Sequence, residues 1–395
     1  MKQRTNVNRK RFLKLVLTLL SVLTLAPTPQ RVAQVPTANP PFSEIAPGIE
    51  YLQINRGTEP AHGPWLINLL RVDLARAELR FVRALDEAVG LETVSSLAAR
   101  YAAVAGINSG YFRTSGTYRG ESIGVMMING KLLSETHNDR AAVGLIRQNS
   151  KTELLLGHLK FSGRLFIGPK IQTVNGVNRP VLANELILFT PEFHRTTLTN
   201  PNGVEAVVRQ GRVTEILDLK GSSRIPADGF VVSASGSARD WIKKNVRLGS
   251  PVRLSLEIHP VDSSQQHLWK LCKTILGGGP QIIKDGKIEI TNSQEKIAPA
   301  FVTDRHPRTA IAKLTSGKVL LATVDGRQPG ISVGMSLPEL ASLLLEFGAV
   351  QAINLDGGGS TTMVVSNKIV NKPSDQAGER PVSDAILVFP RHTNR

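Results

Sequence analysis

Cysteine is almost absent from this sequence. Cys272 is the only one among 395 residues, so no internal disulfide can form and stability must come from a buried core. Cys272 lies in the apolar segment 271–276, where a buried thiol explains it better than a nucleophile does. The sequence also lacks a cysteine cluster and a His-x-x-x-His spacing, so nothing in it indicates a zinc site.

Aromatic residues are scarce, at 5% of the chain, and the basic residues are scattered. Nucleic-acid binding normally needs clustered lysine and arginine with aromatic side chains among them, so we expect no nucleic-acid partner. The formal net charge of +16 instead favours a solvated basic face, or attraction to anionic polymers of a cell envelope.

Acidic residues are missing from residues 1–38, which carry seven basic ones. Six of these precede the apolar run 15–26, and its 12 residues are fewer than the about 20 that a bilayer-spanning helix needs. This order predicts an export signal and the start of a proline-rich linker in residues 1–38; an uncleaved anchor is the alternative. Signal removal would leave no stable transmembrane span and lower the net charge from +16 to +9. We expect export to the periplasm, the cell envelope or the extracellular space.

The remaining sequence has the composition of a folded protein, with 41% hydrophobic and 20% charged residues. Short strands alternate with turns, and the dipeptides at 129–130 and 285–286 predict two hairpins. Clear helices are few, at 94–101 and at 337–347, the second capped by a serine and ended by a glycine. We therefore predict an α+β fold with a mixed β-sheet core, few helices, and a β-rich insertion at about residues 140–260.

Two carboxylates follow apolar strands in the last third of the chain. Segment 319–324 leads to Asp325, and segment 350–355 leads to Asp356, with the second helix between them. A strand, helix, strand order predicts a crossover connection, so these strands are expected to be parallel neighbours with both carboxylates at one sheet edge. Asn108 likewise follows an earlier apolar run and precedes a turn that contains glycine.

A block of glycines and hydroxyl residues follows Asp356, in the order Gly357, Gly358, Gly359, Ser360, Thr361 and Thr362. Glycines would let the chain turn sharply and leave amide N–H groups free to hold an anion. A tight, hairpin-like connection is the alternative. The block lacks the final glycine of a nucleophile elbow and the Gly-Lys-Ser/Thr of a P-loop, so neither a serine hydrolase nor a P-loop nucleotide enzyme is indicated.

The stretch Asp-Gly-Gly-Gly-Ser-Thr-Thr at 356–362 resembles a signature of the phosphodiester glycosidase family. Further segments fit the same family in the same order, at 108–112, 277–281, 307–310, 324–327 and 380–385. They extend the resemblance over about residues 45–390, which implies a catalytic domain of this family. The implied activity is hydrolysis of a sugar-1-phosphodiester to free sugar and a phosphomonoester.

This reaction needs two kinds of acidic group. One carboxylate stabilises or attacks the anomeric centre, or activates water, and a second acidic group manages the proton. We assign Asp356 to the first role and Asp325 to the second, with Glu121 and Asp384 as rivals. An Asp-Gly turn is the alternative for Asp325. The sequence does not decide between inversion and retention.

The phosphate needs cationic partners. A guanidinium group can hold two phosphate oxygens, which makes Arg308 and Arg327 candidates; ion pairs with Asp304 or Asp325 are the alternative. Asn108 would hydrogen-bond a sugar hydroxyl or the phosphate, or else cap a turn. The predicted substrate-binding residues are Asn108, Glu121, Arg308, Arg327, Gly357, Gly358, Gly359, Ser360 and Thr361.

We thus predict an exported hydrolase whose partner is a glycosyl phosphodiester and which needs no cofactor. Whether a divalent metal bridges Asp356 to phosphate is left open by the sequence. The competing hypothesis is a non-catalytic envelope protein that binds or helps to assemble an anionic exopolysaccharide with the same arginines. The export signal and the positive charge fit both hypotheses.

Overall fold

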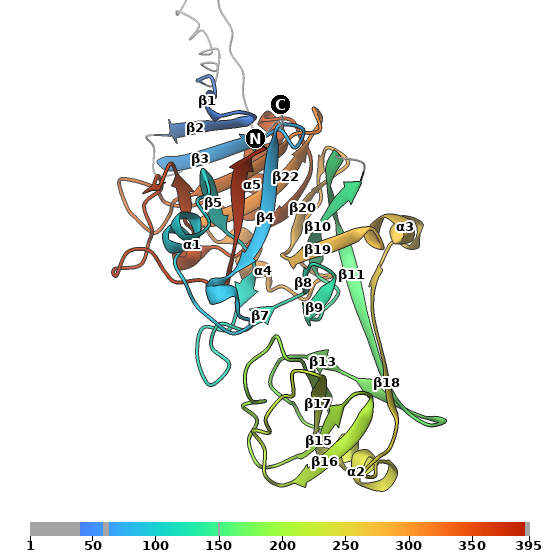
Figure 1. Cartoon of the computed structure of the whole chain (residues 1–395). Coiled ribbons are helices and arrows are strands. Elements are labelled where there is room, and N and C mark those ends of the chain that lie inside the picture. The colour runs from blue at the N-terminus through green and yellow to red at the C-terminus, as the bar shows by residue number, and fades with distance from the viewer. Residues whose placement is uncertain (1–39, 58–62, 149–150, 392–395) are drawn as a thin grey trace, which may run out of the picture. The chain divides into compact units, whose positions relative to one another are not determined.

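The computed structural model describes residues 40–57, 63–148 and 151–391 (Figure 1). The predicted export signal at 1–38 lies outside these ranges and stays a prediction. Strands make up 46% of the structure and helices 13%, which confirms a β-rich fold with few helices; these proportions do not decide the α+β description. In the part that the structure describes, every helix is too short or too polar to cross a bilayer.

An eight-stranded sheet carries the strand ends that form the candidate site. Its order is β1 (Ser43–Ala46), β2 (Ile49–Arg56), β3 (Trp65–Val72), β23 (Val319–Val324), β22 (Arg308–Leu314), β24 (Ala349–Asn354), β20 (Gln281–Lys284) and β21 (Lys287–Ile288). Each neighbouring pair is antiparallel. The hairpin predicted around 285–286 is confirmed as β20 and β21.

The prediction that strands β23 and β24 are neighbours is wrong. They run parallel to each other, but β22 lies between them and is antiparallel to both. β23 first pairs with β22 as a hairpin and with β3 on its other edge, so β24 can join only at the free edge of β22. The carboxyl ends of β23 and β24 still lie at the same edge of the sheet, one strand apart, with the start of β22 between them.

Helix α5 (Leu337–Glu346) begins with a reciprocal capping box. The Ser336 hydroxyl accepts the N–H of Glu339, and the Glu339 carboxylate accepts the N–H of Ser336. Leu340 and Leu344 of this helix share a core cluster with alternate strand residues such as Leu320. The helix predicted at 337–347 is therefore confirmed, and it covers one face of the eight-stranded sheet.

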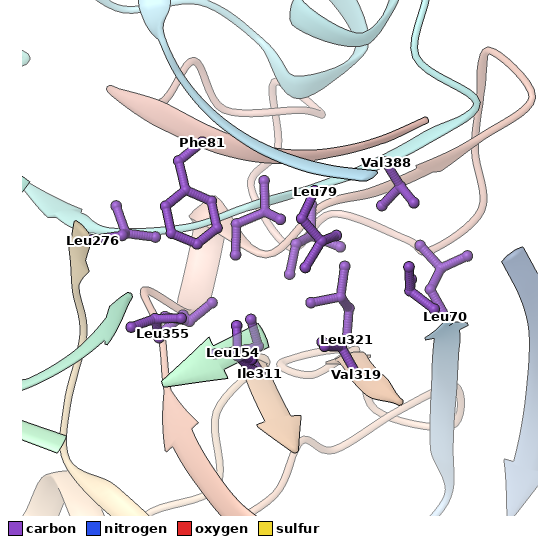
Figure 2. Packing of buried hydrophobic residues seen from close by; sticks show 14 of the residues in the cluster. Leu70, Leu79, Phe81, Leu154, Leu276, Ile311, Val319, Leu321, Leu355 and Val388 are labelled. Carbon is purple, nitrogen blue, oxygen red and sulfur yellow. The ribbon is translucent and has the colours of Figure 1, made fainter. Parts of the chain in front are cut away.

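The opposite face of that sheet packs against a second, five-stranded sheet. Its order is β26 (Lys368–Ile369), β25 (Met363–Val365), β5 (Ala105–Asn108), β27 (Asp384–Pro390) and β4 (Ala77–Arg83). Figure 2 shows Ile311 and Leu321 of the first sheet in one cluster with Leu79, Phe81 and Val388 of the second. Successive side chains of a strand point to opposite faces, so β22 and β23 contribute to both cores.

Helix α1 (Val94–Arg100) leads into β5. The Thr93 hydroxyl accepts the N–H of Ser96 at 3.2 Å, which confirms the capped helix predicted at 94–101. After β5 the chain forms two short strands, β6 (Tyr111–Phe112) and β7 (Ser122–Ile123), which pair with each other. Further short helical elements are α3 (Gln266–Trp269), α4 (Pro299–Thr303) and the 3-10 turns η1 (Ala84–Asp86), η2 (Ser263–Gln265) and η3 (Gly358–Ser360).

A third sheet contains the strands β12 (Lys170–Val174), β11 (Lys151–Ile167), β10 (Ala141–Gln148), β19 (Cys272–Gly277), β8 (Met126–Ile128) and β9 (Lys131–Ser134), with β18 (Val252–Pro260) on β11. The hairpin predicted around 129–130 is confirmed as β8 and β9. Cys272 is 3% exposed, and burial raises the pKa of its thiol to about 12, in line with the predicted inert thiol.

A fourth sheet lies within the segment predicted as an insertion. It contains β13 (Gly176–Val177), β14 (Leu186–Phe189), β17 (Gly229–Ala234), β15 (Val204–Arg209) and β16 (Arg212–Asp218), and helix α2 (Gly236–Asn245) packs on it. The segment 140–260 is thus rich in strands. The described residues from Pro40 onward form one compact unit, and the division into a catalytic domain with an insertion stays a prediction.

Candidate functional site

Asp356 and Arg308 lie on neighbouring backbone segments at one edge of the eight-stranded sheet. In the register of the strands, Asn354 at the end of β24 pairs with Ala310, and Arg308 pairs with Val324 at the end of β23. The chain after Asp356 turns back over the start of β22, where the N–H of Gly358 donates to the Pro307 carbonyl at 2.9 Å. The edge therefore places a carboxylate and a guanidinium on adjacent segments of backbone.

Asp356 is partly exposed, and its surroundings disfavour the ionised form of its carboxylate. Its Oδ1 accepts the N–H of Gly357 at 3.0 Å. Burial raises its pKa to about 7, with a further rise from the charge of Asp384, while Ser360, Arg380 and the Gly357 amide oppose the change. The Ser360 hydroxyl makes no hydrogen bond of ordinary geometry within the described residues, but it lies close enough to act on this carboxylate. A carboxyl group that titrates near neutrality suits acid–base chemistry.

Asp384 and Asp356 both hydrogen-bond to the turn that contains Ser109 and Gly110. The Asp384 carboxylate accepts hydrogen bonds from the Ser109 hydroxyl and, at 2.6 Å, from the Gly110 N–H, while the Asp356 N–H donates to the Ser109 carbonyl at 2.9 Å. Ser383 also donates to Asp384, at 2.6 Å. Asp384 is 1% exposed, and burial holds its pKa above the usual range. Ser109 thus contacts the Asp384 carboxylate through its hydroxyl and the Asp356 backbone through its carbonyl.

Asp325 is placed differently. Both of its carboxylate oxygens are engaged, one by the Asn371 amide at 3.0 Å and the other by the Lys372 N–H at 2.6 Å. It is 1% exposed, and burial raises its pKa to about 6. These bonds give Asp325 a structural role in holding residues 371–372, and its predicted role as second catalytic group stays a prediction.

Arg308 is a buried cation without a carboxylate partner in the part of the chain that the structure describes. Its Nε donates to the Met335 carbonyl at 2.8 Å, and its Nη2 donates to the carbonyls of Phe301 and Asp304 at 2.9 and 2.7 Å. It is 1% exposed, and burial lowers its pKa to about 10. The alternative of an ion pair with Asp304 or Asp325 is not observed. A buried positive charge that lacks an acidic partner favours an anionic ligand.

Two more guanidinium groups border the glycine block. Arg327 is exposed, and a Cβ on Gly358 would lie 3.1 Å from its Nη2. Arg380 pairs with Asp375 through Nε at 2.7 Å, and a Cβ on Gly359 would collide with both side chains. The glycines therefore permit a close approach of these side chains. Arg380 was missed by sequence reasoning, although it begins one of the segments that carry the family resemblance.

Two of the three glycine amides expected to be free, those of Gly357 and Gly358, are engaged, while the expectation for Gly359 stays a prediction. The N–H groups of Gly357 and Gly358 donate to Asp356 and Pro307, and those of Ser360 and Thr361 donate back within the 3-10 turn η3 at 3.2 Å. Backbone donors are satisfied wherever a chain folds back this tightly. Ser360 and Thr361 are buried, and the substrate contacts predicted for residues 357–361 stay predictions.

Asn108 is fully buried and its side chain is occupied. Its Nδ2 donates to the Asp356 carbonyl at 2.7 Å, and its Oδ1 accepts the Thr309 hydroxyl at 2.9 Å and the Thr362 N–H at 3.1 Å. The arrangement matches the alternative in which Asn108 fixes a turn. Its predicted contact with substrate is untested.

Tyr111 is a site residue that sequence reasoning did not select. Its hydroxyl donates to the Gly279 carbonyl at 2.7 Å and accepts from the Asn354 amide at 2.8 Å. Burial and then the charge of Asp356 raise its pKa, while Arg140 and Arg308 oppose the rise. The phenol therefore lies within the electrostatic reach of Asp356 and Arg308 together. Only its membership of the segment 108–112 could have drawn attention to it.

Glu121 lies beside this site, not at the sheet edge itself. Its Oε2 accepts from Arg113 Nε at 2.9 Å, and burial raises its pKa to about 7. It lines a separate pocket of about 390 Å³, and its neighbour Ser122 reaches Asp384 Oδ2 at 3.4 Å.

No group of three His, Cys, Asp or Glu side chains within residues 40–57, 63–148 and 151–391 is arranged to hold a metal ion. The donors around Asp384 are hydroxyl and amide hydrogens, so its oxygens are already committed. Whether a divalent metal bridges Asp356 to phosphate is not tested by this arrangement.

The sequence model of the phosphodiester glycosidase family matches residues 202–389. This match covers a little under half of the chain, so it shows a likeness of this segment to the family. The resemblance seen in the sequence is confirmed, and the matched range includes Arg308, Asp356 and Asp384, whereas Asn108 and Glu121 precede it.

Three proteins illustrate the similarity. Mouse N-acetylglucosamine-1-phosphodiester alpha-N-acetylglucosaminidase is 31% identical over 175 residues, which cover 42% of this chain and 34% of that protein. This chain therefore spans about a third of the length of that curated relative. A Burkholderia pseudomallei protein named as a candidate exported protein has 26% identity and a TM-score of 0.73, over 83% of this chain and 74% of its own. A Synechocystis protein, at 23% identity and a TM-score of 0.74 over 90% and 64% of the two chains, supports the fold alone.

Proposed function

We propose that this protein is an exported hydrolase that cleaves a sugar-1-phosphodiester to free sugar and a phosphomonoester. The observation that carries the proposal is the position of Asp356 and of Arg308, which has no carboxylate partner among the described residues, on adjacent backbone segments at one sheet edge, within the region of family similarity. The activity in the name of the mouse relative supports the same reaction class. The basic and apolar N-terminal sequence and the name of the Burkholderia neighbour support export.

In the proposed reaction the bond between the anomeric carbon and the phosphate oxygen breaks, and its electron pair leaves with the phosphate. A water oxygen bonds to the anomeric carbon, and the carboxylate of Asp356 stabilises the cationic sugar and accepts the proton that water releases. Phosphate is a good leaving group, so stabilising its charge matters more than protonating it. Inversion and retention are both compatible with one carboxylate at this position.

The second acidic group in this proposal is Asp384. Its charge raises the pKa of Asp356, and burial raises its own pKa, so two negative charges at once are disfavoured. A protonated Asp384 would leave Asp356 ionised and able to take up a proton near neutral pH. Asp384 does not face solvent, so it is a positioning residue in this scheme.

The phosphate is proposed to bind between Arg308 and Arg327. Arg308 supplies a charge held by three carbonyls, and exposed Arg327 supplies a second guanidinium group next to Gly358. Both lie on segments that border Asp356, as an anion attached to the anomeric carbon requires.

The test is a panel of sugar-1-phosphodiesters incubated with the protein and followed by phosphorus NMR. We expect a phosphomonoester signal and free sugar in equal amounts, and a loss of turnover of about 10²- to 10⁴-fold in Asp356→Asn with ligand binding retained. A protein that binds anionic glycan without turnover would show no phosphomonoester with any substrate, and the substitution would leave its binding unchanged. That result would establish the competing hypothesis.

A further inference from the structure

Resting on the proposed function, we infer that the polar pocket lined by Glu121 binds the glycosyl group of the substrate, and that this group is an uncharged, hydroxyl-rich sugar. The pocket is a separate hollow beside the sheet edge that carries Asp356. Its volume of about 390 Å³ falls in the range of about 300–1,000 Å³ that small-molecule sites occupy.

The pocket borders the candidate site through strand β7. Ser122 lines the pocket, and its hydroxyl lies 3.4 Å from Asp384 Oδ2. Ile123, also in the lining, pairs in register with Tyr111, whose phenol lies within the electrostatic reach of Asp356. Gly124 faces Gly277, at the start of the glycine segment whose Gly279 carbonyl accepts the Tyr111 hydroxyl. A sugar in the pocket would thus lie next to Asp384, whose charge acts on Asp356.

The charges of the lining argue against an anionic occupant. Three carboxylates face two guanidinium groups: Glu121, Glu135, Glu185, Arg113 and Arg179. Arg179 donates to both Glu135 and Glu185, so its charge is fully compensated. His137 adds no charge at neutral pH, because burial and then Arg140 and Arg179 lower its pKa. The lining carries one net negative charge when Glu121 is ionised and none when it is protonated, so no net positive charge attracts a uronate or sulfated sugar here, while the phosphate finds the arginines at the sheet edge.

One carboxylate oxygen of Glu121 is available to hydrogen-bond a ligand. It is 4% exposed; its Oε2 accepts from Arg113, and no described donor reaches its Oε1. Burial raises its pKa to about 7, so both protonation states are populated near neutrality. A hydroxyl group can donate to the ionised form and accept from the protonated form, whereas a purely cationic or anionic ligand can pair with only one.

Further polar groups complete the lining, from Ser134, Thr136, Asn138 and Asn175. Apolar residues are a minority of it, with Ile123, Pro180 and Leu182. This composition suits a ring that presents hydroxyls on its edge and a small apolar face, and it is poorly matched to a lipid or an aromatic aglycone.

The experiment measures binding of methyl glycosides to the full chain by calorimetry and saturation-transfer NMR, separately from turnover. The ligands are an uncharged methyl hexoside, its 2-acetamido form, its 2-amino form and the corresponding methyl uronoside. The variants are Glu121→Gln and Thr136→Phe. Thr136 is partly exposed, and its side chain makes no hydrogen bond to the described residues. A phenylalanine at this position would therefore fill the pocket without breaking a hydrogen bond. Glu215→Gln, an exposed glutamate of β16, is the matched control.

We expect the two uncharged glycosides to bind and the uronoside to bind at least about tenfold more weakly, with Glu121→Gln weakening the uncharged sugars by about tenfold or more. Thr136→Phe should abolish binding, and Glu215→Gln should leave it unchanged. Equal affinity for the uronoside, preference for the amino sugar alone, or unchanged binding in both pocket variants would overturn the inference. Turnover that persists unchanged in both variants would refute the pocket and keep the hydrolase; sugar binding in the pocket without hydrolysis of any phosphodiester would support the pocket and refute the hydrolase.

Discussion

The side-chain amide of Asn108 donates a hydrogen bond to the backbone carbonyl of Asp356 across 248 residues of sequence, at 2.7 Å. The same side chain accepts hydrogen bonds from Thr309 and from the N–H of Thr362. One buried amide therefore ties the end of β5 to the start of β22 and to both ends of the glycine block. The position of the Asp356 carboxylate depends on this connection.

Asn108→Ala should destabilise the fold and reduce turnover together. It leaves the Thr362 N–H and the Thr309 hydroxyl without their acceptor, and each buried unsatisfied group costs about 1–3 kcal/mol. Urea denaturation should show a loss of about 2 kcal/mol or more in the free energy of unfolding. Asn200→Ala, which removes only a local bond from an exposed turn, should change it by less than about 0.5 kcal/mol. Equal stability of the two variants would show that Asn108 is not a structural connection.

Much of the local structure was predictable from the sequence because its causes are local. The turns at 129–130 and 285–286, the capped helix at 337–347 and the buried Cys272 depend on residues close in the chain. The placement of Asp356 at a strand end was predictable for the same reason. Both carboxylates at one sheet edge followed from the strand, helix, strand order.

The remaining features depend on contacts between distant segments. Whether β24 pairs with β23 or with β22 is decided by β3, which already occupies the other edge of β23. The engagement of Asp325 by Asn371 and Lys372, and the approach of Arg380 to Gly359, join residues with no pattern in common. The engagement of the Gly358 amide could not be predicted, because the Pro307 carbonyl that accepts it comes from the distant segment just before β22.

Substitutions of the two arginines of the candidate phosphate site should differ in their effects on KM and on the free energy of unfolding. Arg327→Ala should raise KM by about tenfold to a hundredfold with little change in stability, because this side chain is exposed and contributes a charge-assisted hydrogen bond to the ligand. Arg308→Lys should weaken binding and also lower the free energy of unfolding by about 1–3 kcal/mol, since a lysine cannot reach three carbonyls in a planar fork.

Steady-state kinetics and urea denaturation on the same preparations separate the two effects. Arg209→Ala serves as the control and should leave KM unchanged. Arg209 is an exposed residue of β15 that pairs with Asp228. An unchanged KM in Arg327→Ala would remove this residue from the phosphate site.

Turnover should rise with pH through about 7. Asp356 must be ionised to stabilise the sugar cation and to accept the proton from water, and its pKa is raised to about 7. The dependence of kcat/KM on pH should therefore show an ascending limb with a midpoint near 7, well above that of an ordinary aspartate. Removing the like charge with Asp384→Asn should move this midpoint to lower pH. A limb near pH 4 would mean that the carboxylate is as solvated as one in a free peptide.

The stability of the fold should have the opposite dependence on pH over the same range. Asp356, Asp325 and Glu121 have pKa values raised to about 7, 6 and 7, above the about 4 expected in an unfolded chain. The folded state therefore binds more protons than the unfolded state between these values, and the stability present below about pH 4 is lost as the pH rises through 6 to 7.

Carboxyl groups with lowered pKa, such as Glu50 at about 2, act in the opposite sense but only below about pH 4.5. His137 and His306, whose pKa burial lowers from 6.5, also act in the opposite sense but only below about pH 6.5, so the loss between about pH 6.5 and 8 is not opposed by them. Urea denaturation from pH 5 to pH 8 should show a falling free energy of unfolding. Glu121→Gln should flatten the curve because it removes one of the three groups, while Glu215→Gln, a substitution of an exposed glutamate, should not. A free energy that rises over this range would mean that these carboxyl groups are ionised in the folded protein at acidic pH, and the proposed uptake of a proton by Asp356 near neutral pH would then have no basis.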